Sequence, residues 1–243
     1  MIYQKIQESF NKKKLFSLLI DPENYDQNRL IHITKQADQS GVDFIMVGGS
    51  LLSNTLNQTI RMIRDHTSIP IVLFPGSLMQ ISPEADGIFL LSLISGRNPE
   101  LLIGHHVLAA NMLKKSDLEV IPTGYILIDG GKTSSVEYIS NTKPIPAEKS
   151  DIITSTAIAG ELLGHQLIYL ESGSGANQTL YPEVIRQVKS QIGIPLIVGG
   201  GLKSAEDVQK ICQSGADMVV VGNILEQYPD QLKAMTHIIK EKL

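Results

Sequence analysis

The amino-acid sequence predicts an α/β protein, a single (β/α)8 TIM barrel with a short or missing third helix. Three observations lead to this fold class. Eight short apolar runs alternate with amphipathic segments, which is typical of a parallel sheet covered by helices. The runs are continuously hydrophobic, as expected for strands buried on both faces. The chain has 243 residues, a usual length for one α/β barrel, so residues 1–243 are expected to form one domain.

The eight predicted strands follow one another without an interdomain linker. They cover residues 15–21, 44–50, 71–76, 87–94, 125–129, 167–171, 196–201 and 218–223. Several end in Gly, Ser, Asp or Asn, which suit tight turns and polar sites at strand tips. Eight such units in one domain favour a closed barrel over an open, doubly wound sheet.

Two connections depart from the regular pattern. Between residues 76 and 87 lie only ten residues, including Pro83, which is close to the shortest crossover that can hold a helix. We therefore expect a short or missing third helix and a gap in the outer ring. The connection between residues 129 and 167 is long and contains a predicted helix over 151–163. Its extra length is compatible with a lid or with an assembly surface.

Composition and charge exclude several classes of protein. Hydrophobic residues make up 42% of the chain and charged residues 19%, which argues against disorder. The formal net charge is -4, so no nucleic acid is expected as a partner. The one dense basic run, Lys12 to Lys14, is interpreted as a solvated turn before the first strand.

Cys212 is the only cysteine, which excludes an internal disulfide, and we expect it to be buried in a helix over 204–214. Residues 1–10 lack the apolar core of a signal peptide, and no apolar run is long enough to span a bilayer. We therefore expect a cytoplasmic protein without a transmembrane segment. Transient contact with a membrane surface stays open.

Glycine-rich turns follow the last three predicted strands. The segments are Tyr169-Leu170-Glu171-Ser172-Gly173-Ser174-Gly175, then Gly199-Gly200-Gly201, then Gly222-Asn223. Backbone amides at such turns suit a phosphate dianion, particularly where a helix follows. The need for a short turn would explain any one of them. Their position at successive late strands, where barrels commonly bind phosphate, predicts an anion site.

Carboxylates and a hydroxyl accompany the glycines. Asp21 ends the first predicted strand, and Ser50 ends the second. Both are candidate ligands of Mg²⁺, which takes few protein oxygens and completes its shell with water and substrate phosphates. For Asp21, capping of a turn is an equal alternative. Glu171, beside the predicted anion site, is interpreted as a general base or as a stabiliser of developing positive charge.

The six histidines predict no metal site, because their spacing brings no convincing set together. Surface or partly buried positions are expected for all of them. They are His32, His66, His105, His106, His165 and His237.

Taken together, the motifs resemble those of geranylgeranylglyceryl phosphate synthases and their bacterial heptaprenylglyceryl relatives. The resemblance spans nearly the whole barrel, and residues 169–176 are its most specific part. It implies that the free primary hydroxyl of sn-glycerol 1-phosphate is joined to a prenyl diphosphate in an ether bond, with release of diphosphate. It also implies a homo-oligomer.

By the same resemblance, Asp21 and Ser50 would hold Mg²⁺. The segment from Tyr169 to Gly175, the glycines Gly199 to Gly201, and Gly222 with Asn223 would bind glycerol phosphate. We assign catalysis to Glu171 and Tyr169, and we expect the prenyl tail in an apolar groove beside the third unit.

The sequence departs from the family at two points. Some members carry a lysine two residues before the metal-binding aspartate, where this chain has Leu19, and some limit prenyl length with a tryptophan, which is absent here. We prefer a prenyl chain of twenty carbons, and a longer chain stays open. Two alternatives stay open: a phosphate-binding barrel isomerase or synthase acting on a phosphorylated sugar, and a noncatalytic phosphometabolite-binding protein.

Overall fold

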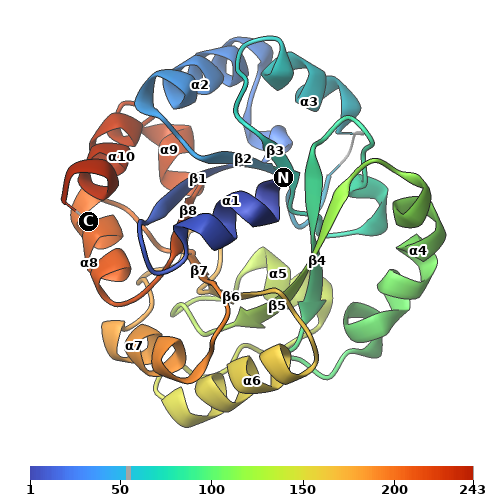
Figure 1. Ribbon diagram of the computed structural model, residues 1–243, viewed down its shortest axis with the longest axis vertical. Coiled ribbons are helices and arrows are strands. Elements are labelled where there is room, and N and C mark those ends of the chain that lie inside the picture. The colour runs from blue at the N-terminus through green and yellow to red at the C-terminus, as the bar shows by residue number, and fades with distance from the viewer. Residues whose placement is uncertain (53–55, 243) are drawn as a thin grey trace.

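The structure, a computed structural model that describes residues 1–52 and 56–242, is a closed barrel of eight parallel strands (Figure 1). The strands are β1 (Leu15–Ile20), β2 (Phe44–Val47), β3 (Ile71–Leu73), β4 (Gly87–Leu93), β5 (Glu119–Leu127), β6 (Leu167–Glu171), β7 (Leu196–Gly199) and β8 (Met218–Val221). Each strand pairs with the next, and β8 pairs with β1. The predicted fold class is confirmed.

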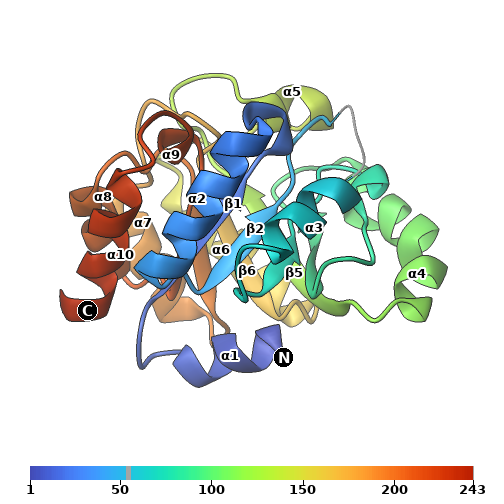
Figure 2. The same ribbon diagram turned by 90° about the horizontal axis from the view of Figure 1, so that it is seen from above.

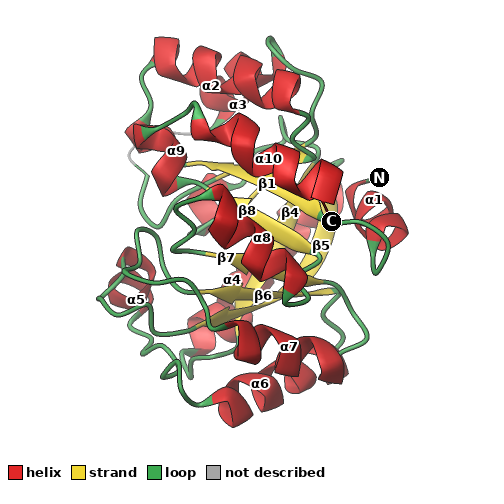
Figure 3. Cartoon of the chain, turned by 90° about the vertical axis from the view of Figure 1, so that its left-hand side faces the viewer, coloured by secondary structure: helices red, strands yellow, loops and turns green. Residues whose placement is uncertain are grey.

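The helices form an outer ring, and a few of them lie at the two ends of the barrel. They are α1 (Ile2–Ser9), α2 (Gln27–Ser40), α3 (Asn57–Arg64), α4 (His105–Lys115), α5 (Ser135–Ser140), α6 (Ser150–Leu162), α7 (Pro182–Gln191), α8 (Ala205–Gln213), α9 (Asn223–Gln227) and α10 (Gln231–Lys242). Helix α1 lies at one end of the barrel, and α5 and α9 lie at the other, as Figure 2 and Figure 3 show.

Buried side chains form two layers, because successive residues of a strand point to opposite faces. In β1, Leu15 belongs to the cluster inside the barrel, whereas Phe16 and Leu18 belong to the cluster between the barrel and the helices. Strands that are covered on both faces must be apolar throughout. The continuous apolar runs of the sequence follow from this packing.

Helix α1 closes the amino-terminal end of the barrel. Ile2 and Ile6 are buried against the interior cluster. The carboxylate of Glu119, at the start of β5, accepts hydrogen bonds from the backbone amides of Ile2 and Tyr3, the latter at 2.9 Å. These amides begin a helix and have no partner within it, so a carboxylate stabilises this end. The opposite end of the barrel remains for a site.

The two unusual connections have the expected character. Residues 74–86, between β3 and β4, contain only a 3-10 helix, η2 (Leu78–Gln80), which confirms the short third helix. The long β5–β6 connection contains α6 close to the predicted position and also α5, which was not predicted. Cys212 is buried in α8, as expected. Among the described residues, no helix combines the length and hydropathy that crossing a bilayer requires.

The predicted start of the fifth strand was wrong. Strand β5 begins at Glu119 rather than Tyr125, and it includes Pro122. Proline normally argues against a central strand because it has no backbone N–H. Here its carbonyl still accepts a hydrogen bond from the amide of Gln166 at 2.8 Å, and Pro122 pairs in register with Leu90. The strand therefore continues through the proline.

Asp217 joins several elements at the amino-terminal end of the barrel. Its side chain is buried, and its Oδ2 atom accepts hydrogen bonds from the amide of Leu196 at 2.8 Å and from Lys189 Nζ at 2.6 Å. Lys14 Nζ lies 3.9 Å from Oδ1. One carboxylate thus connects β1, β7, β8 and α7, and removing its charge would leave Lys189 partly buried without a counterion.

We predict that Asp217→Asn lowers the free energy of unfolding by roughly 2–4 kcal/mol, because breaking a buried ion pair leaves the other charge uncompensated. Urea denaturation measures the change. Glu183→Gln is the matched control, since Glu183 pairs with Arg186 at 2.7 Å on the surface, and exposed pairs contribute about 0.5 kcal/mol. Equal losses in the two variants would contradict a structural role for Asp217.

Candidate active site

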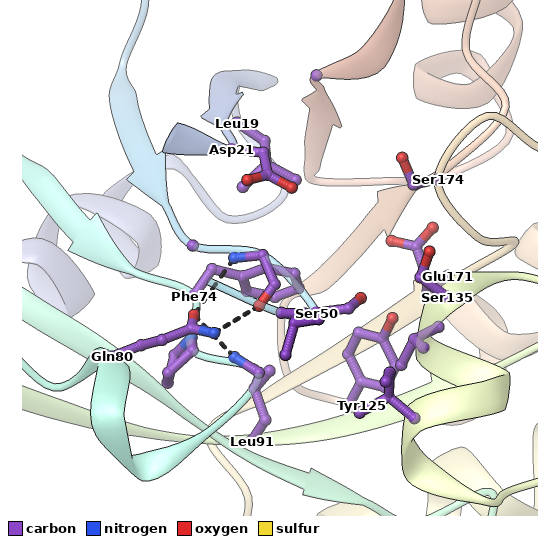
Figure 4. Close-up of a pocket in the computed structure, with 18 of the residues that line it drawn as sticks. Leu19, Asp21, Ser50, Phe74, Gln80, Leu91, Tyr125, Ser135, Glu171 and Ser174 are labelled. Carbon is purple, nitrogen blue, oxygen red and sulfur yellow. Dashed lines mark hydrogen bonds between the residues drawn. The ribbon is translucent and has the colours of Figure 1, made fainter. Parts of the chain in front are cut away.

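A cavity of about 850 Å³ opens at the carboxyl ends of the strands (Figure 4). One part is polar and is lined by Asp21, Ser50, Glu171 and Ser174, among others. The other part is apolar and extends past η2 and β4 to α5. Its lining residues include Phe74, Leu78, Ile81, Leu90, Leu91, Tyr125, Val136 and Ile139. The cavity therefore offers two chemically different surfaces side by side.

Strand β6 places two polar side chains in the barrel interior. Tyr169 and Glu171 point inward, whereas Leu170 between them packs in the outer cluster. The Tyr169 ring is fully buried, with its centroid 5.4 Å from that of Tyr125 and 5.1 Å from that of Phe74. These three rings form a rigid aromatic floor, and Figure 4 shows Glu171 at the edge of the cavity near Tyr125.

Glu171 is 6% exposed, and burial raises its pKa to about 7. Desolvation outweighs the hydrogen bond at 2.6 Å that the amide of Gly173 donates to its Oε1 atom. The Tyr169 hydroxyl lies beside the carboxylate without a hydrogen bond of normal geometry, and its pKa is raised by burial and by the charge of Glu171. A carboxylate that titrates near neutrality can act as a general base.

Gly199 at the end of β7 and Gly200 directly after it make room for these side chains. A Cβ atom on Gly199 would lie 2.1 Å from the Tyr169 hydroxyl, and one on Gly200 would lie 2.3 Å from Glu171 Oε1. Gly200 also has φ +83°, which other residues rarely adopt. The close approach of Glu171 to the backbone thus requires glycine at both positions.

Asp21 faces the cavity from the end of β1. Its Oδ1 atom accepts a hydrogen bond from the amide of Glu23 at 3.2 Å, so it caps the 3-10 helix η1 (Pro22–Asn24), as one interpretation of the sequence expected. Burial raises the pKa of its carboxyl group. A Cβ on Gly49 would lie 2.6 Å from Asp21 Oδ2, so the glycine keeps space free beside the carboxylate.

Gln80 is a positioning residue that the sequence did not reveal. Its buried side chain accepts hydrogen bonds from the amides of Gly49 at 3.3 Å and Gly76 at 3.1 Å. It also donates one to the carbonyl of Gly49 at 2.6 Å (Figure 4). Gln80 thereby holds the turns after β2 and β3 together and fixes Ser50 at the cavity wall. A single glutamine in a short connection belongs to no sequence motif, so its role could not be predicted.

Most of the predicted site residues meet in this cavity. Those that line it are Asp21, Ser50, Tyr169, Glu171, Ser174, Gly175, Gly200, Gly201, Gly222 and Asn223. Ser172, Gly173 and Gly199 lie behind this surface, and the amide of Gly173 is already bonded to Glu171. The side chain of Leu170 faces the helices instead, because β6 alternates. The side chain of Leu170 therefore does not reach the cavity, where the predicted contact with substrate would lie.

Two histidines line the cavity, which the sequence did not predict. His105 and His106 follow a π-helix, η3 (Glu100–Gly104), and His106 Nε2 lies 3.1 Å from the hydroxyl oxygen of Ser92. Burial lowers the pKa of His106, which favours the neutral ring. Among the described residues, no three His, Cys, Asp or Glu side chains gather in a group that could hold a metal ion.

Comparison with known proteins identifies the family. The PcrB family matches residues 8–241. The chain belongs to this family. It is 45% identical to the geranylgeranylglyceryl phosphate synthase of Spirosoma linguale, over 94% of this chain and 92% of that protein. It is 42% identical to the enzyme of the same name from Pyrococcus horikoshii, over 91% of this chain and 87% of that protein.

A solved structure gives the same result for this PcrB-family chain. It superposes with a TM-score of 0.94 on (S)-3-O-geranylgeranylglyceryl phosphate synthase from Thermoplasma acidophilum in complex with sn-glycerol-1-phosphate. The two chains are 34% identical, and the match covers 99% of each. The family resemblance that the motifs indicated is therefore confirmed.

We predict that Gly200→Ala lowers the free energy of unfolding by about 1–3 kcal/mol, because the methyl group meets Glu171 and the backbone adopts a left-handed conformation. Gly164→Ala is the control. Its φ is +91°, but an added Cβ would meet nothing within 4 Å, so a smaller loss of about 1 kcal/mol is expected from the backbone conformation alone. Denaturant titration distinguishes the two, and equal losses would contradict the packing argument.

Proposed function

We propose that this chain is a prenyltransferase that joins the primary hydroxyl of sn-glycerol 1-phosphate to a prenyl diphosphate, preferably geranylgeranyl diphosphate. One observation carries the proposal. A buried carboxylate with a pKa near neutrality, Glu171, lies where a glycine-rich anion site meets an apolar cavity. The proteins that this chain matches over nearly its full length are named for such an activity.

The proposed chemistry assigns each part of the polar cavity a task. Ser174, Gly175 and the turns after β7 and β8 bind the phosphate of glycerol phosphate, which fixes the distant hydroxyl beside Glu171. The hydroxyl oxygen bonds to the first prenyl carbon as the bond from that carbon to diphosphate breaks. Glu171 accepts the hydroxyl proton. Tyr169 packs beside Glu171 as part of the aromatic floor. The dipole of its hydroxyl group stabilises the ionised carboxylate.

The apolar part of the cavity suits the prenyl tail. Because the β3–β4 connection holds no α-helix, the cavity reaches Ile88 and Leu90 on the outer face of β4 as well as Leu91 on the inner face. An allylic chain in this space keeps water away from its reacting carbon.

Asp21 and Ser50 would hold the Mg²⁺ ion that the family implies. One carboxylate and one hydroxyl suit this ion, because Mg²⁺ takes its remaining ligands from water and substrate phosphates. The half-buried carboxylate of Asp21, with space beside it next to Gly49, fits a cation. When bound, Mg²⁺ would stabilise the charge that develops on the leaving diphosphate.

The two alternatives explain less of the cavity. A sugar phosphate isomerase or synthase would use the anion site but has no need of the apolar part. A noncatalytic phosphate-binding protein would not benefit from a buried, titrating Glu171. We also propose a homo-oligomer, since Val107 and Leu108 of α4 and Leu162 of α6 are exposed apolar side chains.

Incubation with radiolabelled sn-glycerol 1-phosphate, Mg²⁺ and prenyl diphosphates of several lengths tests the function directly. Transfer of label into the organic phase, with geranylgeranyl diphosphate as the best donor, supports the proposal. Absence of extractable label with every donor, from a folded protein, contradicts it.

We predict that Glu171→Gln lowers the rate of the chemical step by about a hundredfold or more, because the amide cannot accept the proton. Single-turnover measurements separate this step from binding. In the wild-type protein, kcat/KM should rise with pH up to about 7, where Glu171 ionises. A flat profile between pH 5 and 8, or an unchanged chemical step in the variant, would remove Glu171 from the chemistry.

The same variant should be more stable at alkaline pH. The pKa of Glu171 is about 7 in the folded state against an ordinary value of 4.5. The folded state favours the neutral form of Glu171, so this residue does not destabilise the fold below pH 4.5. The free energy of unfolding then falls as pH rises through about 7 and the buried group ionises. At pH 8 we expect Glu171→Gln to raise the free energy of unfolding by roughly 1–3 kcal/mol.

We predict that Asp21→Asn raises the Mg²⁺ concentration needed for half-maximal turnover by roughly tenfold or more, because the ion loses a charged ligand. Asparagine can still cap η1, and binding of sn-glycerol 1-phosphate without metal should be unchanged. Asp26→Asn is the matched control, since Asp26 caps α2 through the amide of Arg29 at 2.9 Å and is exposed. Identical Mg²⁺ titrations for both variants would leave Asp21 with a capping role alone.

A further inference from the structure

The polar part of the cavity contains more negative than positive side chains. The carboxyl groups of Asp21, Glu171 and Glu226 line it. Among the described lining residues the only lysine or arginine is Lys203, and its Nζ atom donates to the carbonyl of Asn177 at 2.9 Å. A phosphate dianion that enters this environment needs a further cation nearby.

Lys132 supplies a charge at the required place. It belongs to the loop between β5 and α5, and its Nζ atom lies 3.1 Å from the point that a Cβ on Gly175 would occupy. Asn223 Oδ1 lies 3.4 Å from the same point. Gly175 and Asn223 both belong to the predicted anion site. The ammonium group is exposed and forms no hydrogen bond or ion pair with the other residues that the structure describes.

The loop that carries Lys132 is fixed to the glycine-rich loop after β6. The amide of Asn177 donates to the carbonyl of Gly130 at 3.0 Å, and its side chain donates to the carbonyl of Gly131 at 2.9 Å. Further along, a Cβ on Gly173 would lie 2.8 Å from Ser134. The two loops therefore pack together on both sides of Lys132, which limits where its side chain can reach.

The side-chain oxygen of Asn223 faces Gly175 and can accept a hydrogen bond there. Its Nδ2 atom donates to Glu226 Oε2 at 3.4 Å, which turns Oδ1 toward Gly175. An amide oxygen that faces the anion site would repel a phosphate oxygen. An ammonium group has three donors and no acceptor, so Lys132 can satisfy Asn223 and a phosphate oxygen together.

We propose that Lys132 is a substrate-binding residue that forms a charge-assisted hydrogen bond with the phosphate of glycerol phosphate. It supplies this charge from the loop after β5. The anion site is then completed by four loops, those after β5, β6, β7 and β8. That the ligand is glycerol phosphate rests on the proposed function. The contact between Lys132 and a phosphate group rests on the geometry of the site alone.

Calorimetric titration with sn-glycerol 1-phosphate and, separately, with inorganic phosphate tests this role. We expect Lys132→Met to weaken both affinities by about tenfold or more, the scale of a hydrogen bond to a charged group. Lys132→Arg, which keeps the charge, should lie between this variant and the wild type. Lys143→Met is the matched control, because Lys143 is exposed in the same β5–β6 connection, and its side chain is not among the atoms nearest to Gly175. It should bind both ligands as the wild type does.

The outcomes separate this inference from the proposed function. Unchanged affinity of folded Lys132→Met for both ligands overturns the inference. A higher KM for the prenyl diphosphate with unchanged glycerol phosphate affinity also overturns it, because the lysine would then serve the diphosphate. If the wild type binds inorganic phosphate but not sn-glycerol 1-phosphate, the proposed function fails, and the phosphate titrations still decide the role of Lys132. If the wild type binds neither, both fail.

Discussion

Glu171 is buried at the centre of the site, and moving a carboxylate out of water costs several kcal/mol unless its oxygens find partners. Its one hydrogen bond of normal geometry comes from the amide of Gly173. The protonated and ionised forms of Glu171 are therefore both populated near neutral pH. Much of the surrounding sequence follows from this burial. The backbone at Gly199 and Gly200 must approach the side chains of Tyr169 and Glu171 without a Cβ atom. The aromatic floor, which includes Tyr169, must exclude water from the carboxylate.

The other buried carboxylate, Asp217, has the opposite environment. It lies at the amino-terminal end of the barrel, where Lys189 and the amide of Leu196 satisfy its Oδ2 atom. A paired charge of this kind fixes strands together, whereas burial without a cationic partner raises the pKa of Glu171 to about 7. The barrel thus separates the two roles by position: closure by α1 and Asp217 stabilises one end, and the glycine-rich turns of the site occupy the other. The same chemical group is structural or reactive according to the partners that each end provides.

The strands and the site could be predicted from the sequence to the extent that local patterns specify them. Apolar runs specified the strand cores, and counting residues between 76 and 87 predicted the missing third helix. Clustered glycines located the late turns. Contacts between distant segments left no such signal. Glu119 binds the amino terminus of α1, Gln80 joins the turns after β2 and β3, and Lys132 approaches Gly175 from the loop after β5. Each is an ordinary polar residue in the sequence, and only folding brings it to this place.

The missing third helix connects the fold to the proposed reaction. In a regular barrel a helix would cover the outer face of β4, and Ile88 and Leu90 would be sealed from the strand tips. Here the short β3–β4 connection leaves them at the cavity, and the side chain of Gln80 joins the turns after β2 and β3. Apolar surface outside the barrel thus becomes continuous with the polar interior at the tips of β3 and β4. A long apolar substrate and a small anionic one can then approach Glu171 from opposite sides. The apolar tail need not cross the anion site, and this arrangement requires the ring of helices around the closed barrel to lack one helix.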